Sequence, residues 1–221
     1  MEKQSAFAIE TENLSIQFGN QPILKSISLQ LESGKIHGLI GDNGSGKSVL
    51  LKCLCGIIPP DSGTIRIMGQ PICPGGANMP AMGIVIEYPG FLNSMSGWHN
   101  LKYLAGIRGI ADDVAIRESL ELVGLTNDMK KQVKKYSLGM RQKLAIAQAL
   151  MEHPDLFIMD EPFNGLDRTS AATVRQLFSS LRTQGKTFLL VSHHAEDIEE
   201  LCDDVYEIAE GEVKRLSKGV L

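Results

Sequence analysis

The stretch GDNGSGKS, residues 41–48, fits the pattern G-x-x-x-x-G-K-[ST] of a phosphate-binding loop. Before it, KIHGLIG (35–41) is a short apolar run typical of a buried strand, and after it KSVLLKCLCGII (47–58) has the spacing of a helix. Glycines in such a loop let backbone N–H groups converge on phosphate oxygens at the start of the helix, where the helix dipole favours an anion. The stretch therefore predicts a P-loop that binds a nucleotide.

Individual residues of this loop have predicted roles. We expect Lys47 to reach the β- and γ-phosphates and the Ser48 hydroxyl to bind Mg²⁺. The candidate nucleotide-binding residues are Gly41, Asp42, Asn43, Gly44, Ser45, Gly46, Lys47, Ser48 and Val49. A glycine-rich turn without a phosphate role is the alternative, and the strand and helix on either side argue against it.

A second acidic site is predicted where the apolar strand LFIMDEP (156–162) ends. A carboxylate at that position can meet the metal directly or through water, and Asp160 is the candidate metal ligand. Glu161 is placed one residue further, where it can polarise an attacking water as a general base. Carboxylates at strand ends can also be helix caps, but two in succession beside a P-loop favour catalysis.

The hydrophobic patterns divide the chain into three parts. The first third alternates like β-strands, and the middle, from about Trp98 to Met151, has helical spacing. From Asp155 onward, strands and helices alternate, which predicts a parallel sheet with crossover helices. The chain lacks low-complexity linkers and internal repeats, so we expect a single domain over residues 1–221.

Composition limits the classes of function. Hydrophobic residues make up 43% of the 221 residues and charged residues 22%, as in ordinary globular proteins. The net charge of −4 provides no broad basic field, so nucleic acid is not an expected partner. No apolar stretch approaches the roughly 18 residues that span a bilayer, and no signal peptide is evident, so we expect a cytoplasmic protein.

A third stretch, YSLGMRQKLAIAQAL (136–150), resembles the signature motif LSGGQ of ABC transporter nucleotide-binding subunits. Ser137 and Gly139 match that motif, while Leu138 stands for its first glycine and Met140 for its glutamine. The resemblance covers essentially the whole chain, with the motifs in the family's order. We call residues 136–140 the signature below.

Further residues correspond to positions of that family. Phe18 lies where an aromatic residue stacks on adenine, and NGLD (164–167) resembles the D-loop, with Asp167 as its acid. VSHH (191–194) resembles the switch region, with His193 as the catalytic histidine, and His194 has no assigned role.

The resemblance implies the fold and the activity. The fold is an α/β P-loop NTPase with a RecA-like parallel sheet, an antiparallel β subdomain and an inserted helical subdomain at about 92–152. The implied activity is Mg²⁺-dependent ATP hydrolysis that powers a membrane transporter. The signature of one copy would close over ATP held by another, so a head-to-tail homodimer is expected, docked to a polytopic membrane permease at the inner face of the cell membrane.

GIVIEYPGF, residues 83–91, narrows the resemblance further. In the family a glutamine ends this strand and links Mg²⁺ and the attacking water to the membrane partner, whereas this chain has Glu87. We expect Glu87 at the tip of a central strand, as a metal ligand and catalytic group. Glu87 and the SLGM signature together resemble the ATPases of bacterial exporters for bacitracin-type resistance and lantibiotic self-protection.

Several alternatives remain open in the sequence. The chain could be a non-transport ABC ATPase, such as the scaffold of iron–sulfur cluster assembly. Val49 replaces a threonine that would contact the α-phosphate, and Leu138 removes a glycine that would face the second nucleotide. Phe91 and Trp98 fit an exposed docking surface for the membrane partner or, equally, the core of the helical subdomain.

Overall fold

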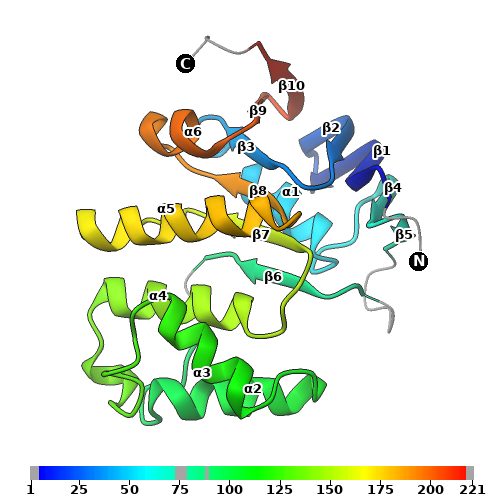
Figure 1. Ribbon diagram of the computed structural model, residues 1–221. Helices are drawn as coiled ribbons and strands as arrows, with labels where there is room; N and C mark the ends of the chain where they lie inside the picture. Colours follow the sequence, from blue (N-terminus) through cyan, green and yellow to red (C-terminus); the bar gives the residue numbers. More distant parts are fainter. Residues whose placement is uncertain (1–4, 73–78, 88–89, 218–221) are drawn as a thin grey trace.

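The computed structural model describes residues 5–72, 79–87 and 90–217. A twisted, mostly parallel sheet lies at the centre of the molecule (Figure 1). The order of its strands is β10-β9-β3-β8-β7-β6. Neighbouring strands pair in parallel except β9 and β10, which form a hairpin. The strands are β3 Ile36–Ile40, β6 Met82–Val85, β7 Leu156–Asp160, β8 Thr187–Val191, β9 Asp204–Ala209 and β10 Glu212–Leu216. The alternation after residue 155 thus predicted the parallel sheet correctly.

A second, antiparallel sheet contains most of the β-rich first third. Its order is β2-β1-β4-β5, built from β1 Phe7–Phe18, β2 Gln21–Glu32, β4 Ser62–Ile67 and β5 Gln70–Pro71. Every pairing within it is antiparallel, as expected for the β subdomain.

The helices surround the parallel sheet and extend below it in Figure 1. They are α1 Lys47–Leu54, α2 Gly97–Arg108, α3 Asp113–Leu122, α4 Leu138–Leu150, α5 Arg168–Thr183 and α6 Ala195–Leu201, with a 3₁₀ turn at Val133–Lys135. The helices α2, α3 and α4 lie together in the predicted helical region. In the described part of the chain, no helix has the length and apolar character needed to cross a membrane.

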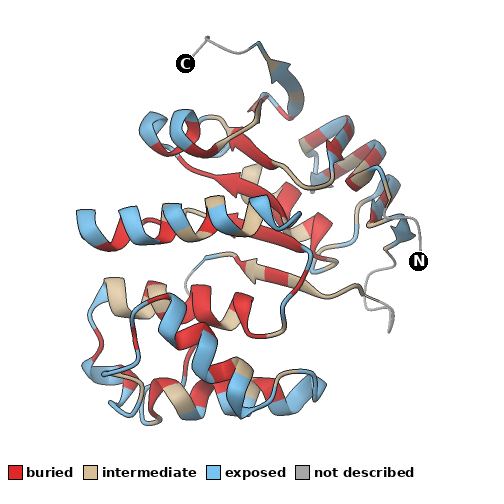
Figure 2. Ribbon diagram, in the orientation of Figure 1, coloured by how far each residue is buried: buried red, intermediate tan, exposed pale blue. Residues whose placement is uncertain are grey.

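Two hydrophobic cores lie on opposite faces of the parallel sheet, as the red segments of Figure 2 indicate. Successive residues of a strand point to opposite faces, so Phe157 and Phe188 join α4 and α5 on one side. Ile158 and Leu189 join α1 and the antiparallel sheet on the other side. The rings of Phe157 and Phe188 stack at 4.6 Å, and the same core continues into α2 and α3.

The helix predicted over 47–58 is shorter in the structure, because α1 ends at Leu54. Gly56 adopts a left-handed conformation with φ 66°, and its amide donates to the Cys53 carbonyl at 3.0 Å. Glycine takes this conformation without steric cost and commonly ends a helix. The helix therefore ends before Ile58, the last residue of the predicted stretch.

The strand before Glu87 was predicted to be central, and this was wrong. In the described residues β6 pairs with β7 alone and forms the edge of the sheet. Its apolar sequence is explained by close packing, because Gly83 lies against the Phe157 ring of β7 and the Ala149 carbonyl of α4. A covered edge strand carries the same apolar residues as a central one, so composition cannot distinguish the two.

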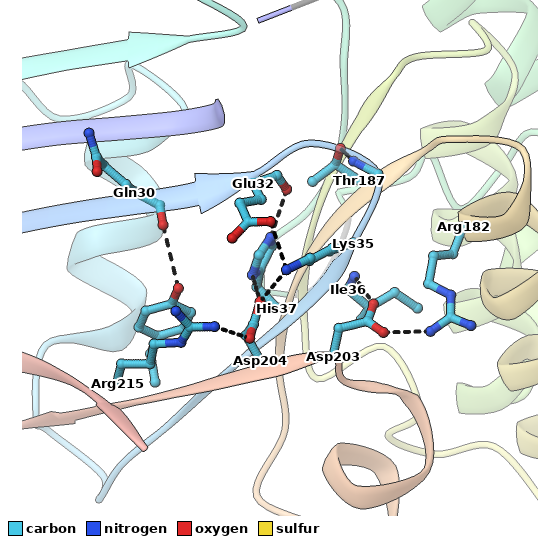
Figure 3. A network of polar contacts seen from close by, with 12 residues as sticks. Gln30, Glu32, Lys35, Ile36, His37, Arg182, Thr187, Asp203, Asp204 and Arg215 are labelled. Carbon is cyan, nitrogen blue, oxygen red and sulfur yellow. Dashed lines mark hydrogen bonds and ion pairs between the residues drawn. The ribbon is translucent and has the colours of Figure 1, made fainter. Parts of the chain in front are cut away.

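A polar network connects the elements at the amino ends of the parallel strands, opposite the P-loop (Figure 3). The buried ring of His37 bonds the Glu32 carbonyl through Nε2 at 2.8 Å. Asp204 pairs with both Lys35 and Arg215. The network therefore ties β2, β3, β9 and β10 to one another.

Candidate nucleotide-binding site

The predicted P-loop lies between the end of β3 and the start of α1. Gly41, Gly44 and Gly46 have φ of 149°, 84° and 109°, values that favour glycine. A Cβ on Gly41 would lie 2.3 Å from the Ile208 carbonyl oxygen, so the loop has no room for a side chain there. Asp42, Asn43 and Gly44 are exposed at the outer side of the loop.

Two groups of the loop fit a phosphate ligand. The Lys47 ammonium donates to the carbonyl oxygens of Gly41 and Asp42 at 2.6 and 2.9 Å, which keeps it folded over the loop. The buried Ser45 hydroxyl oxygen has no hydrogen-bond partner within the described residues. A buried hydroxyl without a partner is costly, and a phosphate oxygen at the loop would satisfy it.

The predicted metal-binding end of the site joins α1 to β7. Ser48, in the first turn of α1, donates from Oγ to Oδ2 of Asp160 at 3.5 Å. Burial raises the pKa of Asp160, and the charges of Glu161 and Glu87 add to this, while the Ser48 hydrogen bond and Lys47 oppose it. A hydroxyl and a half-buried carboxylate are oxygen ligands of the kind that Mg²⁺ prefers. The residues here therefore fit a divalent cation.

Glu161 and His193 meet at the ends of neighbouring strands β7 and β8. Nδ1 of His193 lies 2.8 Å from Oε1 of Glu161. Glu161 has φ 49°, and its amide donates to the Val191 carbonyl, so the backbone holds an unusual conformation at the predicted base. The ring of His194 lies against that of His193 in a tilted arrangement, with 4.1 Å between centroids. The sequence predicted both the base and the histidine, and the structure brings them into contact.

Sequence reasoning missed the residues that hold these two groups. Gln142 of α4 donates to the carbonyls of Glu161 and Pro162 at 3.3 and 3.1 Å. Beyond β8, the Ser192 hydroxyl donates to the buried Asp197, which in turn accepts from Arg175 of α5. Gln142 and Arg175 contact residues about 20 positions away in sequence, and such contacts follow no spacing rule that the sequence would show.

The signature lies at the start of α4 and contacts the D-loop of the same chain. The Ser137 hydroxyl caps α4 by accepting from the Met140 amide at 3.2 Å. A Cβ on Gly139 would lie 2.6 Å from the Gly165 carbonyl oxygen, and one on Gly165 would meet the Leu138 side chain at the same distance. Leu138, the residue that departs from the family's motif, therefore packs on the D-loop.

The remaining predicted nucleotide residues have simple local environments. Phe18 ends β1 and is 51% exposed, which leaves its ring open for stacking. Val49 is half-buried and packs against the core beneath α1. Asp167 caps α5 by accepting from the amide and hydroxyl of Ser170, and these hydrogen bonds lower its pKa. The exposed Asp167 thus has a structural role in the single chain.

Glu87 lies two residues beyond β6 with φ 58°, rather than at the strand end. Its carboxylate forms an ion pair with Lys52 of α1, with 2.5 Å between Oε1 and Nζ. Tyr88 and Pro89, which follow Glu87, lie outside the described residues. The Lys52 partner was not predicted from the sequence.

Phe91 and Trp98 belong to the core of the helical region. Phe91 is 9% exposed, and Trp98 packs against the core with the Arg117 guanidinium 5.5 Å from its ring centroid. Phe91 also lines a cavity of about 550 Å³ between β6 and the helices, whose other walls include Lys52, Ile57, Ile86, Glu87 and Leu104. Both aromatics thus pack in the core of the helical region, and Phe91 also faces this cavity.

Comparisons with known proteins agree with this geometry. The ABC transporter family matches residues 24–164. The bacitracin transport ATP-binding protein BcrA of Enterococcus faecalis is 38% identical over 93% of this chain and 67% of its own length. The lantibiotic transport ATP-binding protein SrtF of Streptococcus pyogenes is 34% identical over 93% of this chain and 88% of its own.

A solved structure shares the fold as well. The ADP conformation of MJ1267, an ATP-binding cassette of an ABC transporter, superposes with a TM-score of 0.80 and is 25% identical. The match covers 95% of this chain and 90% of MJ1267. This chain therefore shares the P-loop NTPase fold of ABC ATP-binding cassettes. The chain therefore belongs to the ABC transporter family, as an ATP-binding subunit with ATPase activity.

Proposed function

We propose that this chain is the ATP-hydrolysing subunit of a membrane transporter that exports antimicrobial peptides or similar drugs. The observation that carries the proposal is that Ser48, Asp160, Glu161 and His193 lie together at the carboxyl ends of the parallel strands. The class of cargo is supported by the similarity to BcrA and SrtF. Because both are transport proteins, they favour a transporter over the non-transport ATPase considered from the sequence.

Nucleotide binding is assigned to the P-loop and to three outlying positions. Lys47 would contact the β- and γ-phosphates, and the Ser45 hydroxyl supports this assignment because it is buried without a partner in the described chain. Phe18 would stack on the adenine. Ser137, Gly139 and Asp167 would face the nucleotide of a second copy.

Ser48, Asp160 and Glu87 would hold Mg²⁺. When bound, the ion would offset the negative charge of the phosphates. The raised pKa of Asp160 supports this assignment, because a cation relieves the repulsion among neighbouring carboxylates that contributes to the shift. Ser48 differs from the two carboxylates, because its neutral hydroxyl adds no negative charge to the site.

The hydrolytic step is assigned to Glu161 and His193. Glu161 would accept the proton of the attacking water, and the contact of its Oε1 with His193 supports this by fixing the orientation of the carboxylate. His193 would contact the γ-phosphate. Most of the barrier reduction in phosphoryl transfer comes from positioning and electrostatics, which the buried anchors Gln142 and Asp197 supply.

A head-to-tail homodimer would complete the site. ATP-binding subunits of this family dimerise and act with membrane permeases. Ser137 stands at the amino end of the 13-residue helix α4, where free N–H groups offer a second anion site. The chain carries one P-loop and one signature, so two copies would enclose two ATP molecules.

A polytopic permease would dock in the cavity beside Glu87. The cavity is lined by apolar side chains around the Lys52–Glu87 pair, which suits an amphipathic segment of a membrane partner. Docking there would hold the chain in the cytoplasm at the inner face of the membrane.

The core that continues from the sheet into α2 and α3 supports one ABC ATPase domain over 1–221, with 92–152 as its helical subdomain.

The proposed chemistry is tested by changing Glu161 to Gln. We expect hydrolysis to fall by about 100-fold or more, while ATP binding persists and a closed dimer accumulates in size-exclusion chromatography. Glu121→Gln, at an exposed position of α3, is the matched control and should hydrolyse ATP like the unaltered chain without accumulating a closed dimer. A Glu161→Gln chain that binds ATP but stays monomeric at saturating ATP contradicts the sandwich.

The transport assignment is tested separately. The tagged Glu161→Gln chain, held closed with ATP, is recovered from detergent-solubilised membranes, and co-purifying proteins are identified. We expect a polytopic membrane protein. Recovery of soluble proteins alone, from a preparation that binds ATP, would agree with the ATPase assignment and contradict the assignment as a transporter subunit.

A further inference from the structure

Glu87 is the one predicted metal ligand whose carboxylate is engaged by a lysine in the structure. Nζ of Lys52 lies 2.5 Å from Oε1 of Glu87, with 27% of the lysine side chain and 61% of the glutamate side chain exposed. Asp160, by contrast, has the neutral Ser48 hydroxyl as its hydrogen-bond partner. The two carboxylates therefore differ in what a cation would have to displace.

Ser48 and Lys52 lie on the same face of α1, because residues four apart in a helix are neighbours on its surface. A rise of 1.5 Å per residue separates their Cα atoms by about 6 Å along the helix axis. Glu87 is thus bound one helical turn away from the hydroxyl at the metal end of the site. Within the described residues its carboxylate has Lys52 as its partner and makes no hydrogen bond to Ser48 or Asp160.

The carboxylates already interact through their charges. The negative charge of Glu87 contributes to the raised pKa of Asp160, after burial and the charge of Glu161. A divalent cation placed among these groups would attract Glu87, and the Lys52 ammonium opposes that move by offering an alternative partner. Lys52 and Glu87 also both line the cavity between β6 and the helices, so the position of the carboxylate changes that cavity's wall.

We propose that Lys52 is a positioning residue that holds Glu87 in this cavity and competes with the metal for its carboxylate. Cation binding with the nucleotide then transfers Glu87 from Lys52 toward Ser48 and Asp160, which frees a lysine in the cavity wall. The inference rests on the proposed function of the site. It predicts that Lys52 sets how much Mg²⁺ increases the affinity for nucleotide.

The test compares ADP affinity with and without MgCl₂ by isothermal titration calorimetry. The chains compared are the unaltered protein, Lys52→Gln, Glu87→Gln and the double variant. Removing Lys52 should increase the Mg²⁺ enhancement of ADP affinity by about threefold, the scale of a partly exposed ion pair. In the Glu87→Gln background the same change should have no effect. Lys52→Arg, which keeps the pair, should behave as the unaltered chain.

Lys102→Gln is the matched control, because it removes a lysine from the surface ion pair with Asp113 in the helical region. It should leave the enhancement unchanged, and thermal melting should show every variant folded. An equal effect of Lys52→Gln with and without Glu87 would overturn the inference, because it would reflect only lost positive charge. No effect in either background would overturn it as well. An unaltered chain that bound no ADP would overturn the proposed function, and the inference with it.

Discussion

Gly139 of the signature lies against the D-loop with no space for a side chain. The distance of 2.6 Å from an added Cβ to the Gly165 carbonyl oxygen is shorter than any ordinary contact, and the obstacle is backbone. Gly139 was predicted for its resemblance to a nucleotide-binding residue. In the single chain, its glycine identity is explained first by this close approach.

Replacing Gly139 with Ala should push α4 away from the D-loop. We expect strain of about 1–3 kcal/mol, expressed as a weaker ATP-dependent dimer with a dissociation constant raised about tenfold, measured by analytical ultracentrifugation. Gly106→Ala, at a helical position with open space around it, is the control and should be neutral or slightly stabilising. Equal dimerisation of the two variants would show that the contact is unimportant for assembly.

At single positions, the sequence predicted candidate site residues but not the residues that contact them. Asp160, Glu161 and His193 were identified because strand ends and motifs place them. Lys52 was not, because helical spacing shows only that a lysine faces outward, while its partner comes from a segment 35 residues away. Asp167 was expected to act on nucleotide, and its capping of α5 is a local role that the same residue also fits.

Among the elements, strand β6 differs most from its prediction. Existence and direction of the strands follow from alternation and from the order of β and α segments. The order of strands within the sheet does not, since it depends on which strands the crossovers bring together. The end of α1 was also missed, because Gly56 ends the helix before residue 58, the predicted end.

The contact of β6 with its neighbours gives a prediction at this scale. Gly83→Ala would place a Cβ 2.4 Å from the Phe157 ring and 2.6 Å from the Ala149 carbonyl oxygen. We expect a loss of about 1–3 kcal/mol in the free energy of unfolding, measured by chemical denaturation. Gly90→Ala, where an added Cβ meets nothing within 4 Å, should leave the midpoint unchanged. Identical midpoints for the two variants would contradict the packing described for β6.

Across the whole molecule, the polar network of Figure 3 should make stability depend on pH. Burial lowers the pKa of His37 despite its hydrogen bond to Glu32. Burial alone would raise the pKa of Asp204, but hydrogen bonds from Arg215 and Lys35 hold it below its ordinary value. Both groups therefore bind protons more readily when unfolded, and stability falls as pH decreases.

The first loss should occur as the pH falls below about 6.5, the ordinary pKa of histidine, and the second below about 3.8. We expect the melting temperature of the unaltered chain to drop between pH 7 and 5.5. The drop should be smaller in His37→Gln, whose amide can still donate to the Glu32 carbonyl. His153→Asn, at an exposed position with φ 50°, should retain the full drop. Parallel curves for both variants would exclude His37 as the source.

The edge position of β6 also bears on the mechanics of the molecule. A central strand can be displaced at its end only by disturbing two ladders of hydrogen bonds, whereas β6 shares one with β7 in the described residues. Strands β3, β7 and β8, which carry the phosphate loop, the acids and the histidine, are each held on both sides. β6 is thus one of the two edge strands of the sheet, next to strands that are held on both sides, and Glu87 follows this more easily displaced strand.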